Sequence, residues 1–277
     1  MRFQGNRSID KLLLFYSRKI PDHPFKIRFV NLLNRLVFKK SIQLNSSSGA
    51  TFFLSTDEYT GHELVYSGYY EPLTTALCDK LVSGGGNIID VGASIGLFSI
   101  HLSKINGTMI YAVEPSVQNF ASLLKNLALN QSKNVLPLNV ALSDHDSFGY
   151  LENMHPQNSG TIKVVNSFDG NQAYLIRLTT LSELIQYLEL KEIALLKIDV
   201  EGFEMNVFKG HFDNENAILP NNIIMEFNSM IDRTKYTTRE CLDYILSLGY
   251  SAFNVYGAPY IFNDPLPESN LWLKKDC

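Results

Sequence analysis

The sequence predicts an α/β protein with a mostly parallel, seven-stranded sheet and helices on both faces. From residue 87 onward, short apolar runs alternate with amphipathic segments of helical length, a pattern typical of parallel strands connected by helices. The first run, residues 87–91, leads into a turn that holds Gly92 and Gly96. Strand, tight turn and helix in this order are typical of a nucleotide-binding unit, in which glycine lets the backbone approach a ligand.

Length and composition fit one large enzyme domain with a small addition. The chain has 277 residues, 45% of them hydrophobic and 19% charged, which is ordinary for a soluble enzyme. Its three cysteines, Cys78, Cys241 and Cys277, are far apart and indicate neither a zinc site nor a disulfide framework, so we expect a reducing, cytoplasmic location. No apolar run approaches the roughly 18 residues of a transmembrane helix.

The first 40 residues are strongly basic, with ten Lys or Arg against two acids, whereas residues 41–277 carry 14 bases and 26 acids. We assign residues 1–56 to a basic helical extension, with helices over 8–19 and 25–39 and a β-hairpin from 41–44 and 50–54. Its apolar stripe predicts either packing on the main domain, which we favour, or peripheral association with an anionic membrane. Nucleic acid is not an expected partner, because the acidic remainder would repel it.

Residues 57–277 are assigned to the catalytic domain. The insertion 143–176 is polar and rich in turn residues, and we expect one or two short strands in it, at 150–151 and 162–165. The sheet strands are expected at 87–91, 109–113, 135–141, 194–199, 222–227, 251–255 and 271–274. The helices are expected at 73–82, 97–105, 117–130, 181–188, from 204, and at 239–248.

Acidic residues at predicted strand ends indicate which nucleotide binds. Glu114 closes the second strand 24 residues after Asp90, where a carboxylate accepts hydrogen bonds from ribose hydroxyls. An alternative is that Glu114 only stabilises a helix N-terminus. Asp144 follows the third strand, where it can accept from an adenine amino group, and Asp90 can hold an ammonium group. Adenine, ribose and ammonium together describe S-adenosylmethionine better than NAD.

Four blocks of sequence resemble the FkbM family of S-adenosylmethionine-dependent methyltransferases: residues 89–99, 113–115, 140–144 and, most specifically, Leu-Lys-Ile-Asp-Val-Glu-Gly-Phe-Glu at 196–204. Tyr-Tyr-Glu-Pro at 69–72 resembles the family's lead-in, while Ser94 departs from its more frequent Asn. The resemblance implies a class I methyltransferase fold and methyl transfer, usually to a hydroxyl oxygen. The residues expected to bind the methyl donor are Glu71, Asp90, Gly92, Ala93, Ser94, Gly96, Glu114, Ser143 and Asp144.

Asp199 and Glu201 are the expected catalytic residues. Asp199 ends the fourth strand of the predicted sheet, beside the expected methyl group, where it can accept a proton from an attacking hydroxyl or orient it. Lys197 points to the same face of that strand and is expected to form a buried ion pair with Asp199 or Glu226. By analogy with catechol-type O-methyltransferases, Asp199, Glu226 and Asn228 form a candidate magnesium site. Magnesium dependence stays open.

The function predicted from these residues is methylation of a hydroxyl of a carbohydrate, glycolipid or related natural product, in glycan or natural-product biosynthesis. The insertion and a group of tyrosines are expected to recognise this acceptor, and His155 is a lesser candidate base. Two rival functions are an NAD-dependent oxidoreductase, against which the missing third glycine argues, and a non-catalytic, methyltransferase-like binding module. The tyrosines are Tyr59, Tyr66, Tyr69 and Tyr70.

Overall fold

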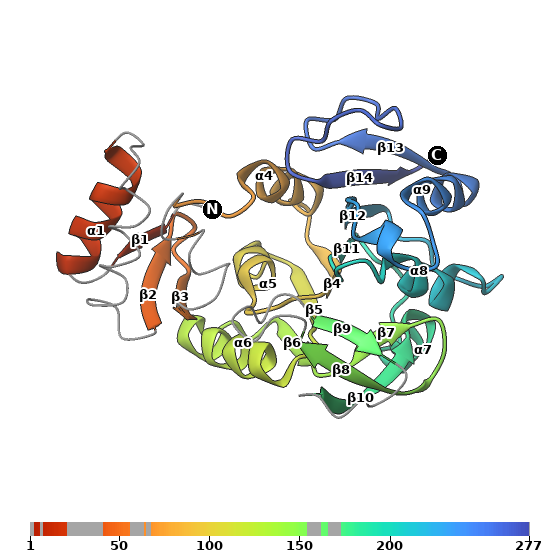
Figure 1. The fold of residues 1–277 in the computed structure, drawn as a ribbon, viewed down its shortest axis with the longest axis horizontal. Coiled ribbons are helices and arrows are strands. Elements are labelled where there is room, and N and C mark those ends of the chain that lie inside the picture. Colours follow the sequence, from red (N-terminus) through yellow and green to blue (C-terminus); the bar gives the residue numbers. More distant parts are fainter. Residues whose placement is uncertain are drawn as a thin grey trace.

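A seven-stranded sheet forms the centre of the computed structural model, which describes residues 3–5, 8–20, 41–55, 64, 68–153, 162–165 and 173–276 (Figure 1). The strand order is β13-β14-β12-β11-β4-β5-β6. The neighbouring pairs from β12 to β6 are parallel, and only β14 runs antiparallel to β12 and β13. This confirms the predicted sheet. The strands are β4 (Gly86–Val91), β5 (Thr108–Val113), β6 (Val135–Leu138), β11 (Leu195–Ile198), β12 (Asn222–Glu226), β13 (Tyr250–Asn254) and β14 (Asn270–Lys275).

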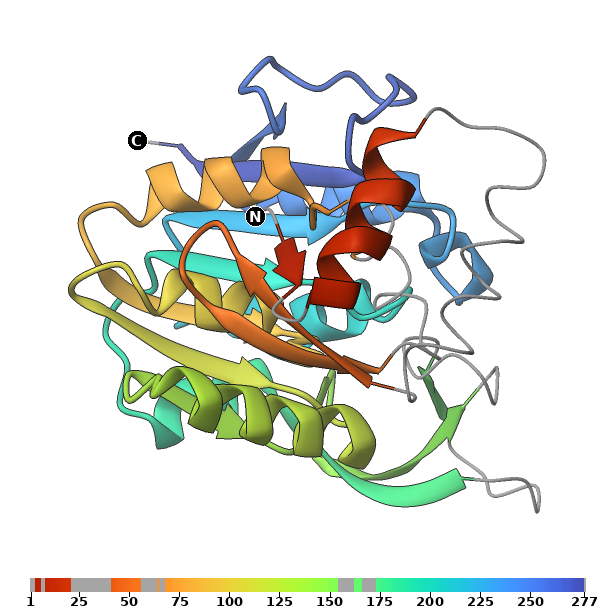
Figure 2. The same ribbon diagram turned by 90° about the vertical axis from the view of Figure 1, so that its left-hand side faces the viewer.

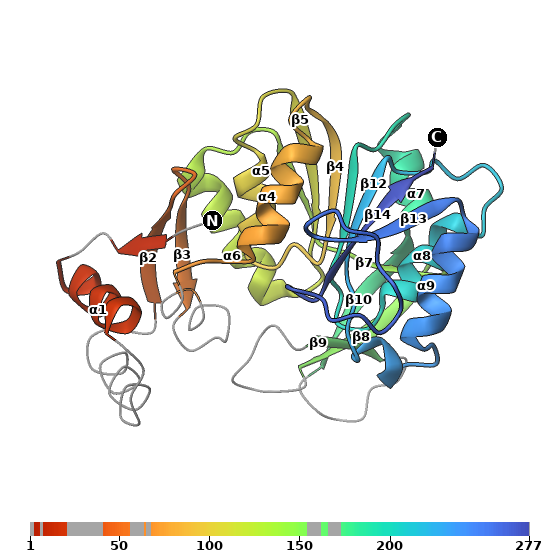
Figure 3. The same ribbon diagram turned by 90° about the horizontal axis from the view of Figure 1, so that it is seen from above.

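Helices cover both faces of the sheet (Figure 3). One face carries α4 (Pro72–Leu81), α5 (Leu97–Leu102) and α6 (Val117–Asn130); the other carries α7 (Leu181–Tyr187), α8 (Glu204–Phe212) and α9 (Thr238–Ser247). Because side chains alternate along a strand, neighbours such as Ile88 and Ile89 belong to the two different cores. Both residues are fully buried, which explains why the strands read as continuous apolar runs.

The N-terminal elements pack on the outer side of α6 through a three-stranded antiparallel sheet, with α1 (Ser8–Lys19) beyond it (Figures 1 and 2). Thr51 and Asn130 exchange two hydrogen bonds, of 2.7 and 2.6 Å, and Phe53 N donates to Asn126 Oδ1 at 2.8 Å. Leu14 and Phe52 are buried in the same core as α4–α6. The sheet consists of β1 (Phe3–Gly5), β2 (Ser41–Ser46) and β3 (Thr51–Ser55).

Helix α1 and the hairpin are therefore confirmed, and for the described part of the extension the contacts agree with packing on the main domain. The strand β1 was not predicted. The helix expected at 25–39 lies outside the described residues, as do Tyr59, Tyr66 and His155. Within the described part of the chain, none of the helices combines the length and apolarity needed to cross a bilayer.

A second, four-stranded sheet in the order β7-β10-β8-β9 occupies the region of the insertion. The expected single strand over 135–141 is wrong: β6 ends at Leu138, and a new strand begins at Ala141, because β6 pairs with β5 whereas β7 pairs with β10. The long strand β10 was not predicted. The sheet consists of β7 (Ala141–Ser143), β8 (Ser147–Asn153), β9 (Ile162–Val165) and β10 (Ala173–Thr180).

Candidate active site

Acidic side chains gather where the parallel strands end, on both sides of the switch point between β4 and β11. Asp90 lies near the end of β4 and pairs in register with Lys197 of β11. Asp199 follows β11 directly, and Glu226 ends β12. In an open α/β sheet, ligands bind at this edge and at this point of the strand order.

The turn after β4 is fixed by contacts within the protein. Gly92 N and Ala93 N both donate to Val113 O, at 2.9 Å. Gly92 has φ 83°, and a Cβ there would collide with the carbonyl oxygen of Asp199; at Gly96, with φ 89°, a Cβ would lie 2.6 Å from Leu123 Cδ1. Gly92 is therefore required by the packing of two backbone segments, whereas at Gly96 the positive φ favours glycine and the Leu123 side chain could move.

Glu114 holds this turn against the start of α6. Its carboxylate is 4% exposed and accepts from Ser94 N and Ser116 N, both at 2.8 Å, and from Asn119 Nδ2 at 3.4 Å. Burial raises its pKa to about 7, although these hydrogen bonds act in the opposite direction. Each carboxylate oxygen can accept more than one hydrogen bond, so Glu114 combines the helix-terminal contact with capacity for a ribose hydroxyl.

Lys197 is a buried cation at the centre of the site. Its side chain is 3% exposed, and its Nζ lies 3.1 Å from Asp199 Oδ2 and 4.7 Å from the centroid of the Phe98 ring. Burial alone would lower its pKa, but the carboxylates of Asp199, Asp90 and Glu71 outweigh burial and raise it. Lys197 is therefore charged, and the predicted ion pair with Asp199 is confirmed.

Only one of the two carboxylate oxygens of Asp90 has a hydrogen-bond partner in the described part of the protein. It is 1% exposed, and its Oδ2 accepts from Ser99 Oγ at 2.6 Å, whereas its Oδ1 is buried without a partner. Burial raises its pKa, against the attraction of Lys197. An unpaired carboxylate oxygen in the interior is costly, and a cationic hydrogen-bond donor would satisfy it.

Three further acids surround Asp199 on the β12 side. Burial, followed by repulsion from Asp199, raises the pKa of Glu201 to about 7 and that of Glu226 to about 9. Glu204 Oε1 accepts from Gly202 N at 3.1 Å while its Oε2 has no partner, and burial raises the pKa of Glu204 to about 7. At neutral pH Glu226 is thus protonated and can donate a hydrogen bond.

The proposed magnesium ligands do not fit a metal ion. Asn228 Oδ1 already accepts from Met230 N at 2.7 Å, and Asp199 Oδ2 is paired with Lys197. Among the described residues, no group of three or more His, Cys, Asp or Glu side chains has an arrangement suited to a metal. Magnesium needs several converging oxygen ligands, and these residues do not supply them.

Glu71 borders the site from the segment before α4, where it has a left-handed backbone with φ 34°. Its Oε2 accepts from Asn270 Nδ2 at 3.0 Å, and burial raises its pKa to about 7. Close by, the Glu268 carboxylate accepts from Leu73 N at 3.0 Å and from Thr74 N at 2.7 Å, and so caps α4. Sequence analysis missed Glu268 and Asn270, because no local pattern links residues so far apart.

The remaining candidates have other partners. Asp144 lies within 2.7 Å of His145 Nδ1 and accepts from Ser143 Oγ at 3.2 Å. Burial acts to raise the pKa of Asp144, but the hydrogen bonds from His145 and Ser143 lower it by more, so the net shift is downward. His101 pairs with Asp79 at 2.6 Å and is a packing residue.

The family model described as "Methyltransferase FkbM domain" matches residues 90–252, more than half of the chain. The chain belongs to this family. Residues 90–252 are accordingly an S-adenosylmethionine-dependent methyltransferase domain, and the strand order is that of the class I methyltransferase fold. The predicted family and fold are both confirmed.

Two fungal methyltransferases are similar in sequence. "Methyltransferase 1" of Beauveria bassiana (strain ARSEF 2860) is 30% identical over 159 residues, which are 50% of this chain and 63% of that protein. "Methyltransferase sdnD" of Sordaria araneosa is 30% identical over 190 residues, 57% of this chain and 73% of that protein. The chain thus spans less than two thirds of the first relative. A solved TehB-like methyltransferase from Corynebacterium glutamicum ATCC 13032 Kitasato is 12% identical, over 78% of this chain and 95% of that one, with a TM-score of 0.43.

Proposed function

We propose that the protein transfers the methyl group of S-adenosylmethionine to a hydroxyl oxygen of a carbohydrate, glycolipid or related natural product. The observation that carries the proposal is the charge balance around Lys197. This one buried cation serves Asp90, Asp199 and Glu71, so the edge of the sheet has an excess of buried carboxylate. S-adenosylmethionine carries an ammonium and a sulfonium group against one carboxylate, so its net positive charge would compensate part of that excess.

Each residue that would bind the donor contacts a different part of it. We assign the ribose hydroxyls to Glu114, the ammonium to the unpaired oxygen of Asp90, and further contacts to Glu71 and the turn at 92–96. Ser143 and Asp144 are assigned to the adenine. When bound, S-adenosylmethionine supplies an electrophilic methyl group.

Asp199 is the group that we assign to the acceptor. Lys197 binds its Oδ2, which fixes the carboxylate and leaves Oδ1 to accept the hydrogen bond of the acceptor hydroxyl. A carboxylate in this place orients the hydroxyl along the line of attack and takes its proton as the new bond forms. Glu201, two residues further on, is a second candidate for the same proton.

Replacing Asp199 by Asn tests this assignment. We expect turnover to fall by at least about 100-fold, the usual contribution of a general base, while the Kd for S-adenosylmethionine, measured by calorimetry, changes little. The control is Asp146→Asn, which removes an exposed carboxylate that also forms an ion pair, with Arg177 at 2.8 Å. Equal turnover in the Asp199 variant, with unchanged thermal stability, would remove Asp199 from the mechanism.

Donor identity is tested separately, with S-adenosylhomocysteine and NAD compared for their effect on the melting temperature. Stabilisation by S-adenosylhomocysteine alone supports the proposal. Stabilisation by NAD alone would support the oxidoreductase instead. Binding of S-adenosylmethionine without transfer to any acceptor would favour the non-catalytic module.

A further inference from the structure

Glu204, the first residue of α8, binds the turn that follows Asp199. Its side chain is 1% exposed, and its Oε1 accepts from Val200 N at 3.3 Å and from Gly202 N at 3.1 Å. Both amides precede the helix, whose N-cap residue, Phe203, forms no capping hydrogen bond with its side chain. The role of Glu204 therefore differs from that of an N-cap side chain, which binds amides of the first helical turn.

The hydrogen bond to Val200 N fixes the peptide group between Asp199 and Val200. At the other end of that group, Asp199 O packs so closely on Gly92 that a Cβ there would collide with it. Asp199 N in turn donates to Val91 O at 3.0 Å. The main chain of Asp199 is thus held by β4 and its turn on one side and by Glu204 on the other. Of these contacts, only the one with Glu204 comes from a side chain, so a substitution can remove it.

The turn that Glu204 binds has a backbone conformation that needs support. Glu201 has φ 55° and Gly202 has φ 100°, so two consecutive residues have positive φ. For a residue with a side chain this conformation is unfavourable, and it persists where the surrounding structure enforces it, often at functional sites. Glu204 binds the amides of the residues on either side of Glu201. Its carboxylate therefore closes the turn around that residue.

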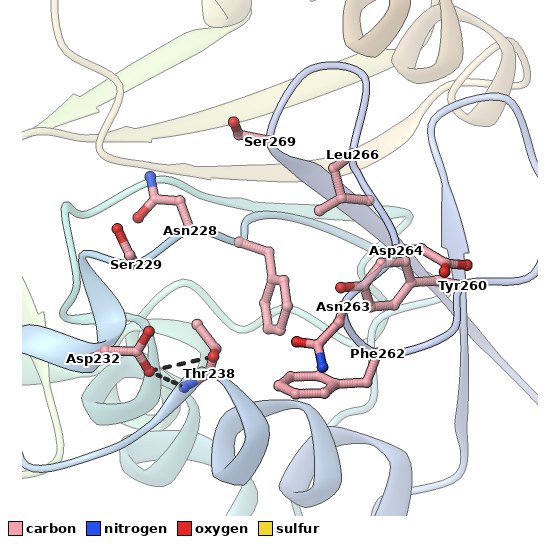
Figure 4. A pocket seen from close by; sticks show the side chains of 11 residues that line it. Asn228, Ser229, Asp232, Thr238, Tyr260, Phe262, Asn263, Asp264, Leu266 and Ser269 are labelled. Carbon is pink, nitrogen blue, oxygen red and sulfur yellow. Dashed lines mark hydrogen bonds between the residues drawn. The ribbon is translucent and has the colours of Figure 1, made fainter.

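The other side of the turn packs on the segment after β12. A Cβ at Gly202 would lie 2.6 Å from Met230 O, next to the short 3₁₀ helix η1 (Ile231–Arg233). Met230 N donates to Asn228 Oδ1 at 2.7 Å, and Asp232 Oδ1 accepts from the first amide of α9 at 2.7 Å. Figure 4 shows Asn228 and Asp232 along one side of the pocket that this segment borders. The turn is thus confined between a braced segment and β4.

The second carboxylate oxygen of Glu204 contributes nothing to stability. Oε2 is buried and, among the described residues, has no partner, an unfavourable state for a carboxylate. Burial raises the pKa of Glu204 to about 7, so both protonation states are present near neutral pH. Oε1 can accept hydrogen bonds in either state. What Glu204 supplies is therefore an acceptor at one point in space, which the amide oxygen of a glutamine could also supply.

We infer that Glu204 is a positioning residue, which holds the turn at 200–202 so that the Asp199 carboxylate faces the methyl group of the donor. The inference rests on the proposed function and deepens it at the same site. Because Glu204 is buried, it acts through Asp199 and not by touching either substrate.

The test compares two ligands of the donor site on the full chain, so that no acceptor is needed. S-adenosylhomocysteine lacks the methyl group, whereas sinefungin has an amine-bearing carbon in place of the methyl sulfonium. Its N–H groups can donate to Asp199, which the sulfonium methyl cannot do. A hydrogen bond between charged groups typically raises affinity about tenfold or more. We therefore expect calorimetry to show at least about tenfold tighter binding of sinefungin than of S-adenosylhomocysteine, and Asp199→Asn to remove this preference.

Variants of Glu204 should change the preference without changing the donor site. Glu204→Ala should lower the preference for sinefungin by about tenfold, with the Kd for S-adenosylhomocysteine nearly constant. Glu204→Asp should act in the same direction, because its carboxylate is one methylene shorter. Glu204→Gln should keep the preference, since it retains the acceptor oxygen. In an Asp199→Asn background, Glu204→Ala should lower the preference no further, because the two residues act as a unit.

Glu183→Ala is the matched control. It removes an exposed glutamate from the first turn of α7 that also accepts from a backbone amide, Thr180 N at 3.2 Å. The preference for sinefungin should stay as in the wild type.

The ratio of the two affinities separates positioning from stability, since a general loosening would weaken both ligands. The inference is overturned if Glu204→Ala and Glu204→Asp keep the preference or weaken both ligands equally. It is also overturned if Glu204→Gln behaves like Glu204→Ala, or if the wild-type protein has no preference. In each of these cases binding of S-adenosylhomocysteine leaves the donor site standing. If S-adenosylhomocysteine itself does not bind, the proposed function fails.

Discussion

Single residues at the active site are in protonation states that they would not have in water. Burial raises the pKa of Asp90 and of Glu71 although the charged Lys197 is nearby, and Glu226 keeps its proton to about pH 9. Such shifts concentrate at functional sites, because a site that must receive charge is built with an imbalance of charge. The pKa of Glu226, about 9, is further from the ordinary value of a glutamate than the pKa of about 7 that Glu71, Glu114, Glu201 and Glu204 share.

Glu226 should make the ligand-free protein less stable as the pH rises. Its pKa is raised from 4.5 to about 9 on folding. The contribution of Glu226 to the free energy of unfolding is therefore fully present below pH 4.5 and is lost as the pH rises towards 9. Between pH 7 and 9 the free energy of unfolding should fall by up to about 1 kcal/mol per pH unit. Urea unfolding across this range measures it.

Glu226→Gln should flatten that decline, because glutamine does not titrate. Glu192→Gln, at an exposed glutamate on the connection before β11, is the control and should keep the decline. A decline of equal slope in wild type and in Glu226→Gln would show that Glu226 is ionised in the folded protein at neutral pH.

At the scale of elements, the turn between β4 and α5 joins three parts of the sheet. Gly92 N and Ala93 N donate to Val113 O at the end of β5, and Gly92 packs on Asp199, the residue after β11. Ser94 N donates to the carboxylate of Glu114, which follows β5. The rigidity of the turn thus comes from its neighbours. Any ligand at this edge finds it already formed.

Gly92→Ala should destabilise the protein more than a positive φ alone explains. Gly249 offers a matched control, since its φ of 84° is nearly that of Gly92 at 83°, but a Cβ there would meet nothing within 4 Å. We expect Gly249→Ala to cost about 1 kcal/mol and Gly92→Ala at least about 2 kcal/mol more, from the collision with Asp199. Thermal or urea unfolding compares the two. Similar costs would mean that the turn can move away from β11.

The elements that sequence predicted well are those whose pattern is set locally. The central strands are apolar on both faces, and their order places Asp90, Glu114, Asp199 and Glu226 at one edge of the sheet. The second sheet was harder to predict, because β10 alternates between buried and exposed residues with an apolar Leu175 on the exposed side, and because Asn139 and Val140 separate two strands that look like one. Partners far apart in sequence, such as Glu268 with Thr74, leave no local pattern.

At the scale of the whole molecule, distant segments meet around the site. The lead-in at Glu71 and the start of α4 are bound by Glu268 and Asn270, just before the last strand. Residues that flank the family-matched region 90–252 on its two sides thus support the same wall of the site. The described part of the N-terminal extension packs on α6, and Arg18 of α1 also donates to Leu64 O, in the segment before Glu71, at 2.7 Å.

Glu268→Ala should loosen that wall. The loss of the carboxylate leaves the first amides of α4 without a cap, which typically costs about 0.5–2 kcal/mol, and it frees the segment that holds Glu71. We therefore expect a lower melting temperature together with weaker S-adenosylmethionine binding in calorimetry. Glu215→Ala, at an exposed glutamate after α8, should change neither. A loss of stability with unchanged donor affinity would show that α4 does not shape the donor site.

The contact between Glu268, Asn270 and the start of α4 also bears on the order in which the protein is made. Asn270 and Glu71 are separated by 199 positions, so this wall cannot form until the ribosome has released the segment before β14. Contacts of such long range form late, because a large loop must close first. A nascent chain that has already paired β4, β5, β11 and β12 would therefore still lack this wall, which can form only after the segment before β14 has been synthesised.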